Sequence, residues 1–286
     1  MPIIKIAIRD DDLSFYSKQE DIDLIYGRYF GRIPISFAVI PFVCEVGQID
    51  QNIKGRGKTL NVGDKKYNIG LNLGLVEYME NKINNNNIYL SLHGYDHKYI
   101  FKNRNYLGEC LWKDKKTLEK ELAGGKNHIE SLFTQRLEVF VPPDNGISKE
   151  CIDVLVNLGI KNINTIFDIK KISRKIDIFY LKNLIKRLFY KVNHTQKPYS
   201  VPQSIFYFKD HREKAAILFN QKMSFEEAKN IFEMQTREGT SRLIIATHHQ
   251  ELIASPTFLS EFKKFLDYLL SVDNVEFVNI KEAFNE

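Results

Sequence analysis

Only three cysteines occur among the 286 residues, Cys44, Cys110 and Cys151, and no two of them form a CxxC pair. An odd number at such wide spacing excludes a disulfide framework and favours a reducing compartment. The longest apolar run, residues 37–44, is far too short to cross a bilayer. Charged residues interrupt the first positions of the chain before any apolar core of signal-peptide length. We therefore expect a cytoplasmic protein without a transmembrane segment.

Excess charge of either sign is also small, because 41 basic and 36 acidic residues leave a net charge of +5. We expect no nucleic-acid partner. Much of the positive excess lies between residues 170 and 191, where apolar residues follow helical spacing at Leu181, Leu184, Ile185 and Leu188. This pattern predicts a basic amphipathic helix. Such a helix either lies on the protein surface with a solvated basic face or meets a membrane or an acidic partner.

Short apolar runs alternate with helical patterns along the whole chain, with no internal repeat and no linker-like stretch. Strands are predicted at Ile3–Ile8, Ile33–Ile40, Ile88–Leu92, Glu138–Val141, Ile160–Ile166 and Leu243–Thr247, near Phe179 and at Ser204–Phe208. Helices are predicted at Glu20–Phe30, Leu71–Ile83, Leu118–Phe133, Ser148–Leu158, Ser224–Thr236 and after Ser255-Pro256. The alternation is typical of a parallel α/β sheet covered by helices, and seven or eight strands favour a barrel. We expect one domain over residues 1–286, with a long loop at about 45–70 near the site.

Charged and imidazole side chains directly follow four of the predicted strands. These are the segments Arg9-Asp-Asp-Asp12, His93-Gly-Tyr-Asp-His97, Pro142-Pro-Asp-Asn145 and His248-His249. Each segment alone has an ordinary explanation, such as a helix cap for the aspartates or a turn for the prolines. However, the active site of a parallel barrel lies at the C-terminal ends of its strands, and such side chains rarely collect there for packing reasons. We therefore expect the four segments to meet in one site.

The spacing of His93 and His97 would bring both rings to one metal ion if they shared a helical turn. Two histidines and one aspartate leave an open coordination position, which is the arrangement of a hydrolytic metal site. A neighbouring aspartate could then take a proton from water, and a histidine opposite could protonate the leaving group. The residues thus predict a metal-dependent hydrolase.

In identity and order, these motifs resemble the polysaccharide deacetylase superfamily (NodB-homology, carbohydrate esterase family 4), and its divergent prokaryotic branch in particular. The matching segments are Arg9-Asp-Asp-Asp-Leu-Ser14, His93-Gly-Tyr-Asp-His97, Phe140-Val-Pro-Pro-Asp-Asn145 and Thr247-His-His-Gln-Glu251. They span most of the chain, and the HxxxH motif is the most specific of them. The resemblance implies a distorted (β/α)7 barrel, a divalent metal that is usually zinc, and removal of acetyl groups from N- or O-acetylated sugars.

The resemblance also implies a role for each residue of the metal centre. Asp12, His93 and His97 would be the metal ligands, and Asp11 would be the general base. This alignment keeps the following Leu-Ser in the position where relatives carry an apolar residue and serine. A shift by one residue, to Asp10 and Asp11, stays open.

Two further catalytic roles follow from the same resemblance. His248 would be the general acid, with His249 as the alternative, and the backbone amide of Asp144 would help to bind the oxyanion. The arginine that relatives carry two residues before the motif proline is Val141 here. The group that orients the base must therefore come from elsewhere, and Arg9 is the candidate.

Together these observations predict a zinc-dependent carbohydrate deacetylase whose substrate is an acetylated saccharide. A metal-dependent hydrolase of another amide, ester or glycan bond is an alternative. A catalytically weak glycan-binding protein on the same fold is a third interpretation. The sequence favours no particular oligomeric state.

Overall fold

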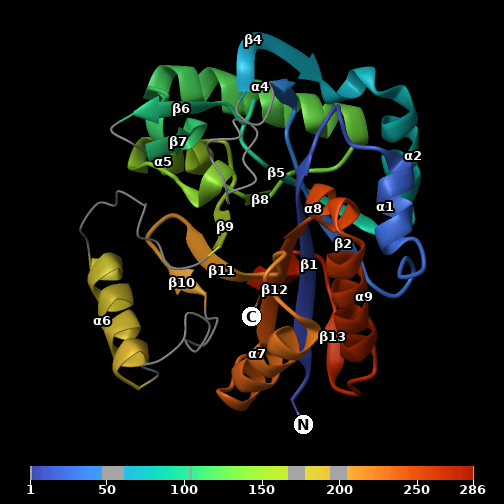
Figure 1. The fold of residues 1–286 in the computed structure, drawn as a ribbon. Coiled ribbons are helices and arrows are strands. Elements are labelled where there is room, and N and C mark those ends of the chain that lie inside the picture. Colours follow the sequence, from blue (N-terminus) through green and yellow to red (C-terminus); the bar gives the residue numbers. More distant parts are fainter. Residues whose placement is uncertain (1, 47–60, 103–104, 167–177, 194–204, 286) are drawn as a thin grey trace.

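A computed structural model describes the chain except for residues 1, 47–60, 103–104, 167–177, 194–204 and 286 (Figure 1). Seven parallel strands form its centre: β1 (Ile4–Leu13), β2 (Ile35–Val39), β5 (Ile88–Leu92), β8 (Val139–Phe140), β9 (Asn162–Ile166), β11 (Arg212–Leu218) and β12 (Arg242–His248). They pair in this order, and β12 returns to β1. The sheet therefore closes into a barrel, which confirms the predicted fold class.

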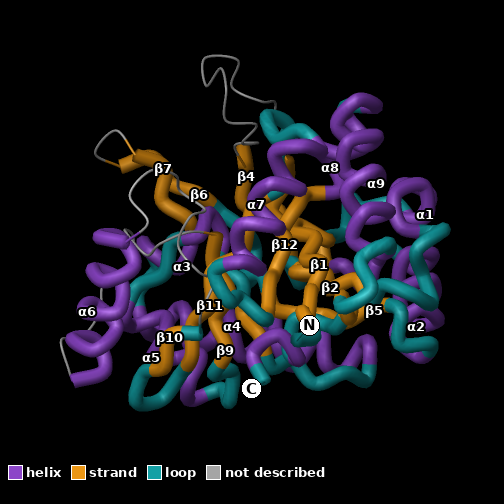
Figure 2. The backbone as a smooth tube through the Cα atoms, turned by 90° about the horizontal axis from the view of Figure 1, so that it is seen from below, coloured by secondary structure: helices purple, strands orange, loops and turns teal. Residues whose placement is uncertain are grey.

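Helices surround the barrel, as the tube in Figure 2 shows. The longer ones are α1 (Gln19–Tyr26), α2 (Leu73–Asn84), α4 (Lys115–Phe133), α5 (Lys149–Asn157), α7 (Phe225–Arg237) and α9 (Pro256–Leu270). Side-chain caps at Asn72, Ser148 and Ser224 accept hydrogen bonds from the first turns of α2, α5 and α7 and fix where these helices begin. In the described residues, no helix combines the length and apolarity needed to span a bilayer.

The strands separate two apolar cores. Most buried side chains lie between the barrel and its helices, whereas a smaller set that includes Ala7, Ile244 and Phe284 fills the barrel itself. Because side chains alternate along a strand, even-numbered residues of β1 face the helices and Arg9 and Asp11 face the interior. The last segment, with η3 (Glu282–Phe284), packs under β1 and β12 and closes the barrel at the N-terminal ends of its strands.

Two hairpins stand beyond the strand ends that carry the predicted site. The stretch predicted as a loop at 45–70 contains β4 (Asn61–Asn68), which pairs with β3 (Phe42–Val46), while residues 47–60 lie outside the described residues. Strands β6 (Tyr99–Lys102) and β7 (Asn105–Gly108) form the second hairpin, which the sequence did not predict. It leads into the short helix α3 (Glu109–Trp112).

One strand prediction is wrong in the region between residues 168 and 211, where the sequence pattern is weakest. The strand predicted near Phe179 lies within helix α6 (Ile178–Asn193), because the apolar residues there recur every three or four positions rather than alternating. Strand β10 (Phe206–Tyr207) does form within the predicted 204–208 segment and pairs antiparallel to β11. A short β13 (Val275–Phe277) extends the sheet beside the start of β1.

Candidate metal and active site

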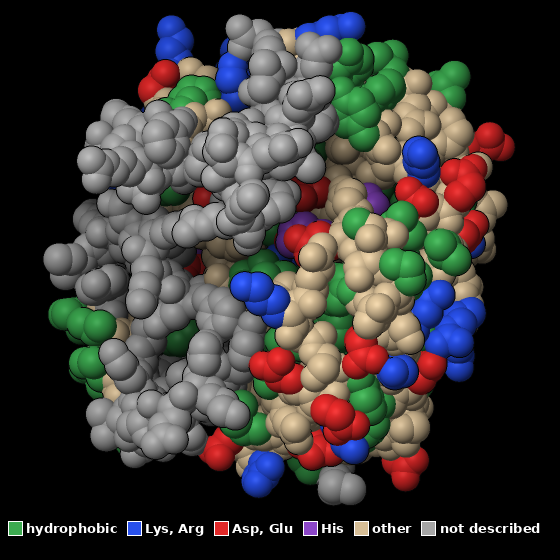
Figure 3. All heavy atoms as spheres, viewed as in Figure 1, with side chains coloured by type: hydrophobic (Ala, Val, Ile, Leu, Met, Phe, Trp, Pro, Cys, Tyr) green, Lys and Arg blue, Asp and Glu red, His purple; other side chains and the backbone are tan. Residues whose placement is uncertain are grey.

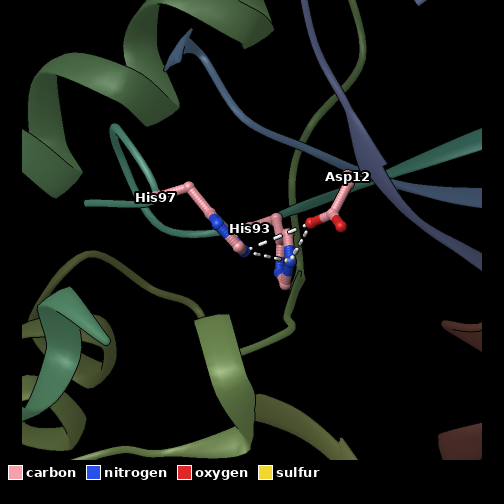
Figure 4. Close-up of side chains that lie close together, drawn as sticks. All are labelled: Asp12, His93 and His97. Carbon is pink, nitrogen blue, oxygen red and sulfur yellow. Dashed lines mark hydrogen bonds and ion pairs between the residues drawn. The ribbon is translucent and has the colours of Figure 1, made fainter. Parts of the chain in front are cut away.

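An aspartate from β1 and two histidines from the loop after β5 converge at one point (Figure 4). Asp12 Oδ1 lies 3.1 Å from His93 Nε2 and 3.2 Å from His97 Nε2, and the two Nε2 atoms lie 3.2 Å apart. Two ligands of a tetrahedral zinc ion, each bonded at about 2.1 Å, lie about 3.4 Å apart. The three atoms therefore fit a common divalent cation. Figure 3 shows histidine and carboxylate atoms together near the middle of this face.

Backbone turns, and not a helix, bring the ligands together. His93 and His97 do not share a helical turn, because both lie in the loop that follows β5. Gly94 has a φ of 69° and His97 a φ of 57°, so the loop folds back on itself. Asp12 has a φ of 70° at a bulge where β1 shifts its register against β2. Such a bulge re-aims a side chain at the end of a strand.

A hydrogen bond from the ring nitrogen that does not face the site fixes the orientation of His93. Its Nδ1–H donates to the carbonyl oxygen of Val141 at 2.8 Å, which leaves the Nε2 lone pair directed at the site. Burial alone would raise the pKa of the Asp12 carboxyl, but the contacts with His97 and His93 outweigh burial and hold that pKa well below its usual range. Asp12 is thus a carboxylate in the folded protein, as a metal ligand must be.

A buried carboxylate that the sequence did not single out holds the histidine loop. Glu109, at the start of α3, is fully buried, and its Oε1 accepts the backbone N–H groups of Tyr95 at 2.8 Å and His97 at 2.9 Å. Lys113 Nζ lies 2.8 Å from Glu109 Oε2 and 2.8 Å from Asp96 Oδ1. Burial alone would lower the pKa of Lys113, but Glu109 and Asp96 raise it. The ammonium group therefore offsets part of the negative charge of a cluster that could otherwise hold a cation, formed by Asp96, Glu109 and Glu121.

Glu109→Ala is expected to lower the free energy of unfolding by about 3–5 kcal/mol, because a buried ion pair loses one partner. Affinity for a divalent metal ion, with zinc as the probe, should weaken about 10- to 100-fold, since His97 loses the group that holds its backbone. Denaturant unfolding and calorimetric titration with zinc measure the two effects. Glu119→Ala removes an exposed carboxylate from α4 and should change neither quantity. An unchanged zinc affinity in Glu109→Ala would contradict the positioning role.

Asp11 and Arg9 form an ion pair inside the barrel. Arg9 Nη2 lies 2.7 Å from Asp11 Oδ2, and both side chains are almost completely buried. Arg9 also donates to the side chain of Asn164 on β9, and Asn164 in turn donates to the Lys214 carbonyl at 2.8 Å. Among the described residues, Asp11 Oδ1 is buried and has no hydrogen-bond partner. Arg9 therefore holds Oδ2 of Asp11, and Oδ1 is available as an acceptor.

Asp10 and His249 lie outside the site, in the layer between barrel and helices. Asp10 Oδ1 lies 2.8 Å from His249 Nδ1, and the Tyr26 hydroxyl donates to Asp10 Oδ2 at 2.6 Å. The Nε2 atom of His249 lies 3.0 Å from the Ser17 hydroxyl. Burial alone would lower the pKa of His249, but the contact with Asp10 raises it. The two residues form a buried pair that joins β1 to α8 (His249–Ala254).

The side chain of His248 points to the opposite side of the chain from that of His249, because side chains alternate at the end of β12. Its Nε2 lies 3.9 Å from Asp12 Oδ2, and its side chain is partly exposed. In the part of the chain that the structure describes, His248 Nδ1 is buried and has no hydrogen-bond partner. The structure thus brings His248, and not His249, to the aspartate and histidine cluster.

Asp144 and Tyr99 border the same cluster. Asp144 lies in η2 (Pro143–Asn145), directly after β8, with a left-handed φ of 54°. Burial is the largest cause of the raised pKa of the Tyr99 hydroxyl, and the carboxylates of Asp12 and Asp144 raise it further. The Tyr99 ring also packs edge-on against His97, with 5.2 Å between centroids. Nothing in the sequence singled out Tyr99 except its position two residues after the motif histidine.

The chain matches no protein-family model and no curated protein sequence. Solved structures do resemble its fold. The Xyl-CE4 domain of a multidomain xylanase from the hindgut metagenome of Trinervitermes trinervoides has a TM-score of 0.52 at 12% identity, over 99% of this chain and 90% of that one. A family 4 acetyl xylan esterase from Clostridium thermocellum, in complex with a cobalt ion, has a TM-score of 0.51 at 11% identity, over 98% and 90%.

A third similar structure is a CE4 family pseudoenzyme from Bacillus anthracis, with a TM-score of 0.50 at 8% identity, over 99% of this chain and 66% of that one. Enzymes and a pseudoenzyme thus share this architecture, so the fold alone does not decide activity. The closed barrel of seven parallel strands and the match over nearly the whole chain give this protein the NodB-type fold of carbohydrate esterase family 4.

Proposed function

We propose that the protein is a metal-dependent hydrolase that removes acetyl groups from an acetylated saccharide. The observation that carries this proposal is the convergence of Asp12, His93 and His97 beside Asp11 and His248 at the C-terminal ends of the strands. The esterase with the same fold supports the choice of an acetyl ester or amide, and the cobalt ion in it supports a divalent cation.

Asp12, His93 and His97 would hold the metal, for which we propose zinc. Their three donor atoms are within ligand distance of one another, and the Val141 carbonyl fixes the ring of His93 for coordination. A divalent ion bound there would supply Lewis acidity and lower the pKa of water. The resemblance to deacetylases and the imidazole-rich donor set favour zinc over magnesium or calcium, which prefer oxygen ligands.

The chain's own residues supply the proton transfers. Arg9 fixes one oxygen of Asp11, so the other oxygen can accept a proton from the attacking water. His248, whose Nε2 lies 3.9 Å from Asp12 Oδ2, can give a proton to the departing amine or alcohol. The Asp144 amide is the candidate donor to the developing oxyanion, as the sequence resemblance implies.

An aromatic cluster formed by Phe15, Tyr16 and Tyr67 supports a saccharide as the substrate. Phe15 and Tyr67 stack with 5.1 Å between ring centroids, and Tyr16 lies 5.6 Å from Tyr67. Tyr16 is exposed and follows Asp12 by only four positions. Exposed aromatic rings offer flat apolar faces with polar edges, which suit the C–H faces and hydroxyl groups of sugar rings.

A catalytically weak glycan-binding protein is the second candidate. The buried Nδ1 of His248 finds no hydrogen-bond partner in the described residues, so no side chain there fixes the tautomer or the ring. An unoriented general acid would slow the departure of the leaving group without preventing sugar binding.

We also propose a reducing, cytoplasmic setting. All three cysteines are buried and free, although the thiols of Cys110 and Cys151 lie within hydrogen-bonding reach of each other. Adjacent thiols that stay reduced are typical of proteins in that environment.

Metal analysis of the purified protein, paired with acetate release from a panel of N- and O-acetylated saccharides, tests the proposed function. We expect about one zinc per chain and metal-dependent release that a chelator abolishes and added zinc restores. Bound metal with turnover of other esters or amides only would favour a different hydrolase. Sugar binding without turnover would favour the weak glycan-binding protein.

A further inference from the structure

Helix α6 exposes its apolar face instead of burying it. Ile178, Leu181, Leu184, Ile185 and Leu188 are between 39% and 67% exposed. The helix lies at the edge of the molecule in both views (Figures 1 and 2). An exposed stripe of aliphatic side chains is unfavourable in water and marks a surface that meets another apolar phase.

The polar side of the helix holds it to the rest of the chain. Asn183 is almost completely buried, and its side-chain amide donates to the Tyr207 carbonyl on β10 at 2.9 Å. At 100° per residue, Asn183 lies about 200° around the helix from both Leu181 and Ile185. The apolar stripe therefore points away from the body of the protein, which is the reverse of an ordinary surface helix.

Positive charge accompanies the apolar stripe. The helix sequence contains Lys182, Lys186, Arg187 and Lys191 and no acidic residue. Lys182 is exposed and sits between the stripe and the buried side of the helix. A long basic side chain at such a border can reach lipid phosphates while its neighbours enter the acyl region.

We propose that α6 docks the protein onto an anionic membrane surface, parallel to the bilayer plane. A lipid surface satisfies both features, because its interior accepts the aliphatic stripe and its anionic headgroups attract the net positive charge of the helix sequence. A second copy of the chain would instead bring together two helices whose sequences carry a net positive charge, and these repel each other. This proposal is independent of the hydrolase proposal, since none of these residues belongs to the candidate site.

Flotation with phosphatidylcholine vesicles, with and without phosphatidylglycerol, tests the proposal on the full chain. The protein should float with the anionic vesicles, less so at high salt, and should stay behind with neutral ones. The double substitution Leu181→Ser and Ile185→Ser should weaken vesicle binding at least about tenfold for each residue replaced. These positions are exposed, so the variant should unfold at the same denaturant concentration as the wild type.

Leu24→Ser and Leu73→Ser provide the matched control, because these leucines are at least as exposed, at 57% and 75% against 45% and 67%, but lie on α1 and α2. The control should bind vesicles like the wild type. Equal binding by the α6 variant, or no binding of the wild type to anionic vesicles, would overturn the proposal. A dimer in light scattering that the α6 substitutions dissociate would also overturn it, in favour of self-association. Release of acetate from soluble sugars should be the same in all three proteins.

Discussion

Asp12→Ala is expected to lose its bound metal and to release acetate about a thousand times more slowly than the wild type, or not at all. Asp12 supplies the only carboxylate of the three donor atoms that lie within 4.8 Å of one another. Without it, the two imidazoles carry no negative charge to balance a dication. Loss of several kcal/mol of transition-state stabilisation corresponds to this decrease in rate. Metal analysis and acetate release on the same preparation measure both effects.

Two control variants separate the metal site from general damage to the protein. Asp273→Asn removes an exposed aspartate near the opposite end of the barrel, and His128→Gln replaces a histidine on α4. Both should keep full metal content and activity. An Asp12→Ala protein that still binds zinc and still hydrolyses the substrate would disprove the assignment of Asp12 as a ligand.

Asp11→Asn should retain its metal and lose about 10²- to 10⁴-fold in kcat, which is the usual contribution of a general base. The amide keeps the size of the side chain but cannot accept the proton. Metal content, kcat and KM measured together distinguish this result from loss of the metal. Turnover within twofold of the wild type, at full metal content, would exclude Asp11 as the base.

The same substitution has a cost in stability that must be measured separately. Arg9 is fully buried and its ion-pair partner is Asp11, so Asp11→Asn leaves a buried charge without its counterion. We expect the free energy of unfolding to fall by about 3–5 kcal/mol. Activity should therefore be assayed well below the unfolding temperature, with folding checked by circular dichroism. Arg9→Met offers a second test, because it should reduce kcat while leaving the Asp11 carboxylate in place.

The rule that the active site of a parallel barrel lies at the C-terminal ends of its strands predicted which residues would meet. It did not predict the backbone turns that bring them together. Asp12, His93 and His97 could be assigned to one face from the order of strands alone, since parallel strands end on the same side. The left-handed turns at Gly94 and His97 bring the rings together, and this loop is held by the Glu109 carboxylate, 12 residues after His97 and beyond a hairpin. A glutamate in a short segment looks like a surface residue, so its burial could not be predicted.

Alternation along β12 separates His248 from His249, which point to opposite sides of the strand. Along β1 it separates Asp10 from Asp11 but would place Asp12 on the same side as Asp10, because only the bulge at Asp12 turns that side chain toward the site. The choice required knowing which side of each strand faces the interior. Strand β11 was not predicted, because it begins with three charged residues, of which Glu213 and Lys214 are buried. Charged residues in a barrel strand hide the apolar signal on which strand prediction depends.

The ion pair of Arg9 with Asp11 gives this protein a practical advantage for engineering. Both residues come from β1, so the turn after β8 need not supply an arginine. The Val141 carbonyl that holds His93 is a backbone atom, which any residue at that position provides. Libraries could therefore randomise the side chains of this turn to select for other substrates while the ion pair inside the barrel stays unchanged.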